Sequence, residues 1–185
     1  MKQRAPTINY ASAPTALGLI FVATFEEKIY NVQFADDEAA ALEELQNYLD
    51  KRLPQATLDK AKKDNPLLQQ SLTLLKNYLN SPSSALYKEL QALPLCIQGT
   101  EFQQAVWHAL MTIPVGQTRS YTEIAQQLDS PKAIRAVANA CASNRLGIIV
   151  PCHRVLRSDG GISGYRWGVA RKKQLIAMEG KNKDR

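Results

Sequence analysis

The pattern of apolar residues changes near Gly99, and this change restricts the chain to folds with two unlike parts. Before that point apolar and polar residues alternate, which is typical of strands with one buried face. The predicted strands are residues 7–11, 17–24 and 29–34. Beyond that point apolar residues recur at helical spacing. We therefore expect an α/β domain, a small sheet with helices, over residues 1–92 and a mainly helical domain over residues 93–185.

Helical spacing of apolar residues also occurs in the first domain, after the strands. The predicted helices of the whole chain are residues 39–52, 66–79, 101–112, 121–128, 131–142 and 169–178. Asp36, Asp37 and Glu38 precede the first of them, where carboxylates complement the helix dipole. Glu26 and Glu27 suit the turn between the second and third predicted strands. Residues 80–98 are expected to be a connection, and the final strand prediction falls within it, at 94–97.

Two of the predicted helices form a helix-turn-helix candidate. Ser120 stands at an N-cap position and Glu123 follows three residues later, which is the capping-box pattern. Pro131 occupies a favoured position at the start of the next helix. Two short helices joined by a tight turn suit docking on DNA. Helical hairpins are also common in proteins that never bind DNA, so this pattern alone leaves both interpretations open.

Positive charge is concentrated in the second half of the chain. Residues 98–185 carry 13 basic and 6 acidic side chains, a net of +7, whereas residues 1–97 carry 10 and 11, a net of −1, which together give the formal +6. A concentrated positive region indicates a polyanionic partner, with nucleic acid as the first candidate. The alternative is a solvated basic surface, particularly over the tail 181–185.

The segment Pro151-Cys152-His153-Arg154 follows the apolar run 146–150, which predicts a short buried strand. Cationic neighbours favour the thiolate form of a cysteine, which is the form that attacks electrophiles. We therefore expect Cys152 to be a nucleophile with a lowered pKa. The alternative is a small buried hydrophobic residue, as free cysteines often are.

The chain offers little material for metal or disulfide chemistry. Its three cysteines, Cys96, Cys141 and Cys152, are an odd number without a short-spaced pair, and residues 1–95 contain neither Cys nor His. We expect no metal and no cofactor, since a Gly-rich phosphate loop is also absent. No run reaches the roughly 18 apolar residues of a membrane helix, and the basic start lacks the apolar core of a secretory signal. The expected location is cytoplasmic.

A long and ordered set of motifs resembles the O6-alkylguanine-DNA alkyltransferases, also called methylated-DNA–protein-cysteine methyltransferases. The segment 149–155, Ile-Val-Pro-Cys-His-Arg-Val, is similar to the active-site segment of that family. The other matches are 99–107 (Gly-Thr-Glu-Phe-Gln-Gln-Ala-Val-Trp), Ser120-Tyr121, 132–137 (Lys-Ala-Ile-Arg-Ala-Val), 163–168 (Ser-Gly-Tyr-Arg-Trp-Gly) and Met178-Glu179-Gly180. The resemblance is dense over residues 99–180 and loose before them.

The resemblance implies a fold and an activity. The fold would join a ribonuclease H-like α/β domain to a winged-helix-like helical domain. The activity would be that of a methylated-DNA–[protein]-cysteine S-methyltransferase, a single-turnover DNA repair enzyme that moves the alkyl group of O6-alkylguanine irreversibly to Cys152. O4-alkylthymine is an open second substrate. The implied partner is double-stranded DNA containing O6-alkylguanine. The protein would act as a monomer, would not bind a membrane and would use no cofactor.

Four residues match the catalytic positions of the family. Cys152 would be the nucleophile and methyl acceptor. The resemblance implies that Glu179 orients His153, which deprotonates the thiol through a water molecule, following the logic of nucleophile, base and orienting acid. Tyr121 would donate a proton toward N3 of the leaving guanine. By position alone, Glu179 could as well be a solvated glutamate and Tyr121 a core residue.

The helix 131–142 matches the family segment that enters the minor groove of DNA. Minor-groove contact reads sequence poorly, which suits a search for damage at any site. Arg135 would be the arginine finger that replaces an extruded nucleotide in the base stack. The helix-groove contacts would come from Ala133, Ile134, Ala136 and Ala138, of which Ile134 is the bulkiest. Alanine is also the best helix former, so a purely structural role is the alternative.

The remaining matched residues would shape the pocket or hold it together. Asn144 would satisfy buried backbone groups in a turn, and Arg154 would pair with backbone carbonyls or an acid. Tyr165 would wall the base pocket with its ring. Trp167 would narrow the alkyl end of the pocket and slow benzyl transfer relative to methyl transfer. The set also includes Val155 and Arg166.

Three other functions compete with this one. A damage sensor would bind alkylated DNA without repairing it, but sensors related to this family lack the reactive cysteine. A transcriptional regulator would carry this module fused to a metal-binding, DNA-binding domain, for which residues 1–98 offer no cysteine cluster. The chain could still be a fragment of such a protein, although Met1 suggests a complete start. A cysteine hydrolase would need a spatially separate base and an oxyanion site, which no pattern here indicates.

Overall fold

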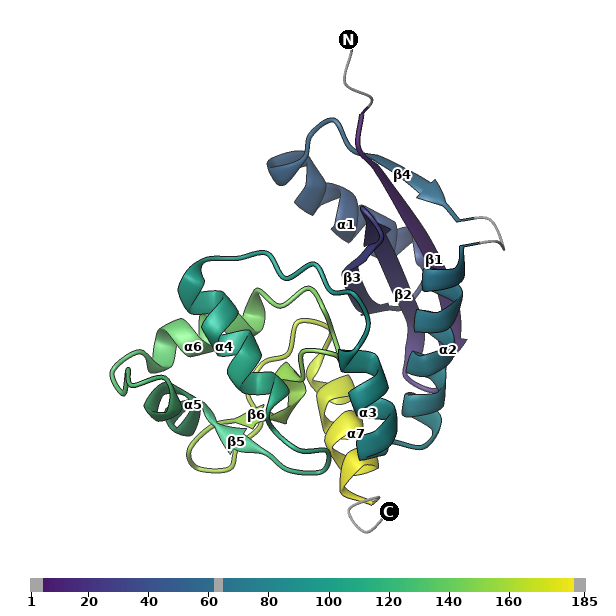
Figure 1. Ribbon diagram of the computed structural model, residues 1–185. Helices are drawn as coiled ribbons and strands as arrows, with labels where there is room; N and C mark the ends of the chain where they lie inside the picture. The colour runs from purple at the N-terminus through teal and green to yellow at the C-terminus, as the bar shows by residue number, and fades with distance from the viewer. Residues whose placement is uncertain (1–4, 62–64, 182–185) are drawn as a thin grey trace.

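The computed structural model describes residues 5–61 and 65–181, and it begins with a four-stranded mixed sheet. The strands are β1 (Thr7–Thr15), β2 (Gly18–Phe25), β3 (Lys28–Ala35) and β4 (Thr57–Lys60). Their spatial order is β3-β2-β1-β4, and β4 runs parallel to β1 while the other neighbours are antiparallel (Figure 1). Glu26 and Glu27 both have positive φ, as tight hairpin turns require. The three predicted strands and the predicted turn are therefore confirmed.

Helices cover both faces of this sheet. The helices of this half are α1 (Glu38–Arg52), α2 (Pro66–Asn80) and α3 (Ser84–Gln91). Asp37 caps α1 by accepting a 2.8 Å hydrogen bond from the Ala40 amide, which confirms the predicted acidic start. Leu45 and Leu49 of α1 pack on one face of the sheet, and α2 packs on the other (Figure 1).

The second half is mainly helical, as expected. Its elements are α4 (Glu101–Met111), β5 (Arg119–Ser120), α5 (Tyr121–Gln127), α6 (Ile134–Ala142), the 3-10 helix η1 (Cys152–Arg154), β6 (Val155–Leu156) and α7 (Val169–Gly180). β5 and β6 pair in parallel. The predicted capping box of α5 is present, because Ser120 and Glu123 exchange side-chain and backbone hydrogen bonds.

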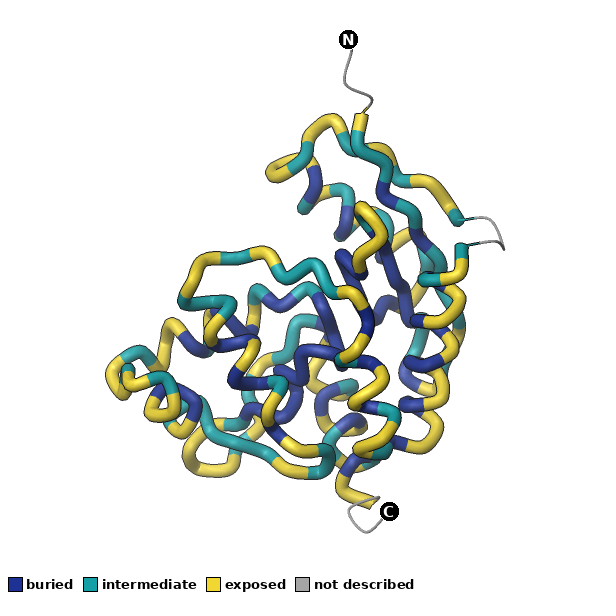
Figure 2. Tube along the Cα trace, viewed as in Figure 1, coloured by how far each residue is buried: buried dark blue, intermediate teal, exposed yellow. Residues whose placement is uncertain are grey.

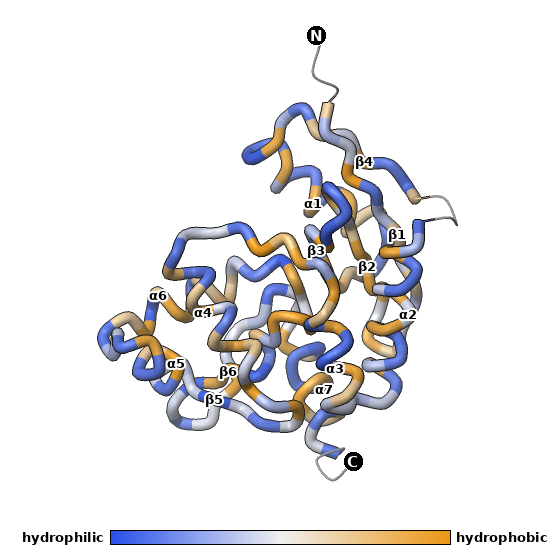
Figure 3. Tube along the Cα trace, in the orientation of Figure 1, coloured by the Kyte–Doolittle hydropathy of each residue, from blue (hydrophilic) through white to orange (hydrophobic). Residues whose placement is uncertain are grey.

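One continuous core joins the two halves. Val32 of the sheet, Tyr78 of α2, Val106 of α4 and Leu175 of α7 all belong to the same buried cluster. Figure 2 shows buried chain running from the sheet into the helical half, and Figure 3 shows apolar residues along the same segments. Residues of the N-terminal half can therefore reach groups that the C-terminal half presents.

Several local predictions are wrong. Residues 146–150 form a turn rather than a strand: Leu146 makes a single parallel bridge to Val32, and Ile148 has a φ of 69°. The run is apolar because it is buried between the two halves, and a short apolar run does not distinguish a strand from another buried segment.

The connection predicted over residues 80–98 contains α3, whose start is capped by Ser83. The strand predicted at 94–97 is reduced to a bridge between Leu95 and Ile29. The helix predicted from residue 131 begins at Ile134 instead, because Ser130 and Ala133 form a turn before it. The mostly exposed β4 lacks the apolar alternation that reveals a strand and was not predicted.

Candidate active site

Cys152 lies at the wall of a cavity of about 410 Å³ in the helical half. Pro151 precedes the short helix η1, which begins at the cysteine, and the residue is only 4% exposed. The cavity is lined by Tyr121 of α5, by Ala138, Cys141 and Ala142 of α6, by Cys152, and by residues 163–166. A thiol in this position is accessible to a group that fills the cavity and sheltered from bulk water.

Asn144 holds the turn that delivers the cysteine. Its side-chain amide donates 2.8 Å to the carbonyl of Val150 and 3.2 Å to Sγ of Cys152. Its Oδ1 accepts a 2.8 Å hydrogen bond from the amide of Leu146. One buried side chain therefore fixes both ends of the turn and also contacts the sulfur.

The protonation state of Cys152 differs from the expectation. Burial raises the pKa of the thiol, although the Asn144 hydrogen bond and the charge of Lys172 oppose this. The expected lowering by His153 and Arg154 is wrong, because both are turned toward Glu179. Cys152 is therefore a thiol at rest and needs a base before it can attack.

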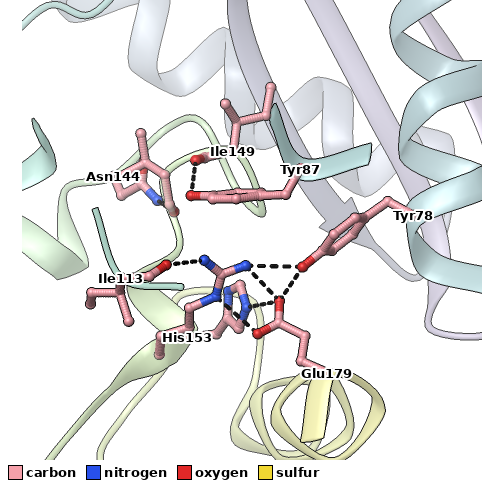
Figure 4. Close-up of polar contacts among 9 residues, drawn as sticks. Tyr78, Tyr87, Ile113, Asn144, Ile149, His153 and Glu179 are labelled. Atoms are coloured by element: carbon pink, nitrogen blue, oxygen red, sulfur yellow. Dashed lines mark hydrogen bonds and ion pairs between the residues drawn. The ribbon is translucent and has the colours of Figure 1, made fainter. Parts of the chain in front are cut away.

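His153 has the state that such a base requires. Burial lowers the pKa of its imidazole, although Glu179 opposes the shift, so the ring is neutral at pH 7. Nε2 lies 2.8 Å from Oε1 of Glu179 (Figure 4). Although burial opposes it, contact with His153 and Arg154 holds the pKa of Glu179 well below its usual range. Because a carboxylate only accepts, Nε2 carries the ring proton and Nδ1 keeps its lone pair.

The Glu179 carboxylate is satisfied by groups from distant parts of the chain. Arg154 donates to it from Nε at 2.9 Å and from Nη2 at 3.0 Å, and the Tyr78 hydroxyl donates at 2.6 Å. Arg154 also donates 2.6 Å to the carbonyl of Ile113 and lies 4.2 Å from the centre of the Tyr87 ring. These contacts fully bury an ion pair, which is tolerated only when its hydrogen bonds are made.

Tyr78 and Tyr87 were not singled out from the sequence, and both belong to helices of the N-terminal half. The hydroxyl of Tyr87 donates 3.0 Å to the carbonyl of Ile149, beside the turn that carries Cys152 (Figure 4). Aromatic residues on an amphipathic helix normally indicate only a core position. No local pattern could have shown that their hydroxyls face the site.

Lys172 is a third residue that the sequence did not reveal. It is fully buried, and its Nζ donates 2.7 Å to the carbonyl of Val155 and 3.1 Å to Oγ of Ser163. Ser163 in turn lies 2.5 Å from the hydroxyl of Tyr121. Burial lowers the pKa of Lys172, while Cys152 and Cys141 oppose the shift. A buried cation thus stands behind the cavity wall, linked to a tyrosine that lines it.

Tyr165 lines the cavity, but Trp167 does not. The Trp167 indole packs edge-on against Tyr165 at 5.3 Å and against Phe34 at 6.5 Å, and it covers Gly147 so closely that a Cβ there would lie 2.8 Å from the ring. The prediction that Trp167 narrows the alkyl end of the pocket is therefore corrected. Its ring supports Tyr165 instead.

Two family models match the chain in succession. The ribonuclease-like domain of 6-O-methylguanine DNA methyltransferase matches residues 8–87, and the DNA-binding domain of the same family matches residues 101–181. The crystal structure of the Mycobacterium tuberculosis O6-methylguanine methyltransferase is similar, with 30% identity and a TM-score of 0.73 over 95% of this chain and 94% of that one. The chain belongs to the 6-O-methylguanine DNA methyltransferase family.

Two further relatives are informative for this family member. The bifunctional transcriptional activator/DNA repair enzyme Ada of Escherichia coli is 46% identical over 178 residues, 96% of this chain and 47% of that protein. The chain thus spans about half the length of the curated relatives it matches. The M. tuberculosis protein solved in complex with DNA is 30% identical, with a TM-score of 0.71 over 95% of this chain and 94% of that one. Among residues 5–61 and 65–181, no helix has the length and apolar character needed to cross a membrane.

In this methyltransferase-family chain, α6 presents its N-terminal turn to solvent. Ile134, Arg135 and Ala136 are exposed, and Ile134 is among the largest exposed apolar side chains. Ala133 and Ala138 are half-buried, and Ala138 lines the cavity that holds Cys152. The same helix therefore borders both the solvent and the thiol.

Proposed function

We propose that this chain repairs DNA by transferring the alkyl group of O6-alkylguanine to its own Cys152, as a methylated-DNA–protein-cysteine methyltransferase. The family assignment and the names of its relatives support this activity. The observation that carries the proposal is the position of a thiol in a cavity bordered by α6, with a neutral imidazole beside it. The proposed reaction uses the thiol as nucleophile and the imidazole as base, and it uses no cofactor.

The reaction is a displacement at the alkyl carbon. A bond forms between Sγ of Cys152 and that carbon, and the bond between the carbon and O6 of guanine breaks. The thiol proton passes through a water molecule to Nδ1 of His153, which is buried and makes no hydrogen bond to a described residue. Glu179 stabilises the imidazolium that forms, as an acid does in a nucleophile–base–acid triad.

The leaving guanine requires a proton. Burial raises the pKa of the Tyr121 hydroxyl, so it is protonated at neutral pH and can donate toward N3 of guanine. Ser163 and Lys172 lie behind this hydroxyl and orient it through their hydrogen bonds. The products are guanine and S-alkylcysteine, and the proton on the His153 imidazolium returns through solvent to the Tyr121 hydroxyl. Because a thioether is stable and none of the described residues that line the cavity can remove the alkyl, the chain acts once.

The alkylated base must leave the duplex to reach Cys152, since the sulfur lies in a cavity. We infer that α6 enters the minor groove and that Arg135 takes the place of the extruded nucleotide. The exposure of Arg135 and of its neighbours on α6 supports this, as does the DNA complex of the M. tuberculosis relative. O4-alkylthymine would present its alkyl group in a similar way and is included as a second substrate.

We also propose the division into domains 1–92 and 93–185, which the two successive family matches support. The chain would act as a monomer on double-stranded DNA. A cytoplasmic location is consistent with a reaction that needs Cys152 reduced, because thiols stay reduced there.

The test is the mass of the intact protein after incubation with a duplex that contains one O6-methylguanine. We expect a gain of one methyl group per chain, located on Cys152 and absent in Cys152→Ala. Cys141→Ala is a matched control, because Cys141 lines the same cavity, and it should still gain one methyl group. Binding of the duplex without any gain in mass would contradict the proposal.

A further inference from the structure

A second cavity, of about 380 Å³, adjoins the one that holds Cys152. Ala142 and Arg166 line both cavities. The second cavity lies between α1 of the sheet domain and the C-terminal end of α6. We call it the arginine groove and define it by Tyr48, Arg52, Gln98, Asn139, Arg145 and Arg166.

The arginine groove carries more positive charge than the protein neutralises. Three guanidinium groups line it, and one carboxylate, that of Glu44, accepts from Arg145 at 3.3 Å and from Arg166 at 2.9 Å. Arg52 makes no ion pair with any residue that the structure describes. Three positive charges against one negative charge leave a net of +2.

The guanidinium groups also make contacts with uncharged groups of the protein. The Arg145 guanidinium lies 3.9 Å from the centre of the Tyr48 ring and that of Arg52 lies 5.6 Å from it. Arg166 donates 2.9 Å to the carbonyl of Ala142. Cation–π contacts and the hydrogen bond to the carbonyl already order these long side chains. Less conformational entropy is therefore lost when a ligand binds.

Crowding of like charges is a cost that an anion would relieve. Burial lowers the pKa of Arg145, and the nearby charge of Arg166 lowers it further, although Glu44 opposes both. The exposed side chains of Gln98 and Asn139 add hydrogen-bond donors to the same groove. Guanidinium and amide donors around a groove of this kind are the groups that bind phosphate oxygens.

We propose that the arginine groove binds the phosphodiester backbone of DNA next to the extruded nucleotide, so that α1 of the sheet domain is part of the DNA interface. This inference rests on the proposed function, because the base in the Cys152 cavity sets where its own strand lies. Ala142 and Arg166 line both cavities. The backbone that carries a base in the first cavity therefore passes next to the second. Phosphate contacts of this type position a duplex without reading its sequence.

The test compares two neighbouring cations in the last turn of α1. Arg52 lines the groove, whereas Lys51 does not, and both are exposed at the same helix end. The affinity for an undamaged duplex is measured by fluorescence anisotropy at several salt concentrations for Arg52→Ala, Arg52→Lys and Lys51→Ala. We expect Arg52→Ala to weaken binding several-fold and to reduce the slope of log K against log salt by about 0.9, the loss of one phosphate contact. Arg52→Lys should retain most of the slope, and Lys51→Ala should match the wild type.

Equal effects of Arg52→Ala and Lys51→Ala would overturn the inference, since they would show only a change in overall charge. Methyl transfer by the wild type is measured in parallel, with the duplex at saturating concentration. If the wild type transfers no methyl group while Arg52→Ala still weakens binding, the proposed reaction fails and the groove stands. If methyl transfer occurs and Arg52→Ala has the same salt slope as Lys51→Ala, the inference about the arginine groove fails while the proposed function stands.

Discussion

Tyr78, on α2, donates a 2.6 Å hydrogen bond to Glu179, on α7, across 101 residues of sequence. The same hydroxyl accepts a 2.9 Å hydrogen bond from Nη2 of Arg154. The N-terminal domain therefore supplies a polar partner to the buried pair of Glu179 and His153, in addition to the apolar surface on which the second domain packs.

Replacing Tyr78 by phenylalanine should weaken both the fold and the reaction. The change leaves Glu179 and Arg154 each without one buried partner, which we expect to lower the free energy of unfolding by about 1–3 kcal/mol. The single-turnover rate should fall as well, because His153 loses part of its orientation. Urea unfolding and a methyl-transfer time course measure the two effects. Tyr10→Phe is the control, since Tyr10 belongs to the separate core beneath α1. A Tyr78→Phe variant with the stability and rate of that control would contradict the role.

The free energy of unfolding should decrease on the acid side below pH 6.5. Burial lowers the pKa of His153 from its usual 6.5, so the unfolded chain takes up a proton there that the folded chain does not. Because the unfolded state binds more protons, stability falls as the pH falls. Glu179, whose pKa is depressed despite burial, adds a further loss below its usual 4.5.

Urea unfolding at pH 7.5, 6.0 and 4.0 measures these two steps. In His153→Gln, which retains a donor toward Glu179, the loss between pH 7.5 and 6.0 should shrink while the loss near pH 4 remains. A stability that increases between pH 7.5 and 6.0 in the wild type would show that the pKa of His153 is raised rather than lowered.

Much of the fold could be predicted because its signals are local. The strands of the hairpins alternate in sequence, and the caps at Asp37 and Ser120 are set by residues within one helical turn. The turn at 146–150 could not be predicted, because its apolar character arises from burial between two domains that sequence alone does not place. The same reason hid α3, whose apolar residues Tyr87 and Leu90 face a core shared with the second domain.

Cys152 was predicted as a nucleophile from its neighbours in sequence, whereas His153 and Glu179 were predicted as base and acid only through resemblance to a family. The three residues lie together in the structure, but their environment differs from the one expected from sequence neighbours. Arg154 follows the cysteine by two positions and yet pairs with Glu179. The cations whose charges oppose the rise in the thiol pKa are Lys172, twenty residues away, and Arg166. Adjacency in sequence says little about direction once a chain turns into a short helix such as η1.

Truncating Trp167 should destabilise the protein without widening its substrate range. The indole is buried against Phe34 and Tyr165, so Trp167→Ala should cost about 3–5 kcal/mol of unfolding free energy. The ratio of benzyl to methyl transfer rates should stay near the wild-type value, because the ring does not line the cavity. Tyr165→Ala, which opens the cavity wall directly, should change that ratio. The rates are compared on matched oligonucleotides, and a selective gain in benzyl transfer by Trp167→Ala would restore the original expectation.

Removing the charge of Lys172 should make Cys152 less reactive. Methionine has a similar length and keeps the buried volume, but it provides neither the positive charge near the sulfur nor the hydrogen bonds to Val155 and Ser163. The charge of Lys172 is one of the influences that lower the pKa of Cys152 against the effect of burial, so that pKa should rise further. Each unit of increase reduces the thiolate fraction about tenfold at a given pH.

The rate of alkylation of Cys152 by iodoacetamide, followed by peptide mapping between pH 7 and 10, reports this change directly. The pH dependence should move to higher pH in Lys172→Met and stay unchanged in Lys173→Met, which removes an exposed neighbouring charge from the same helix. Circular dichroism confirms that both variants are folded, since a general loss of structure would expose the thiol and speed the reaction rather than slow it. An unchanged profile in a folded Lys172→Met would contradict the role of Lys172 and leave the Asn144 hydrogen bond and the charge of Arg166 as the influences that oppose burial of the thiol.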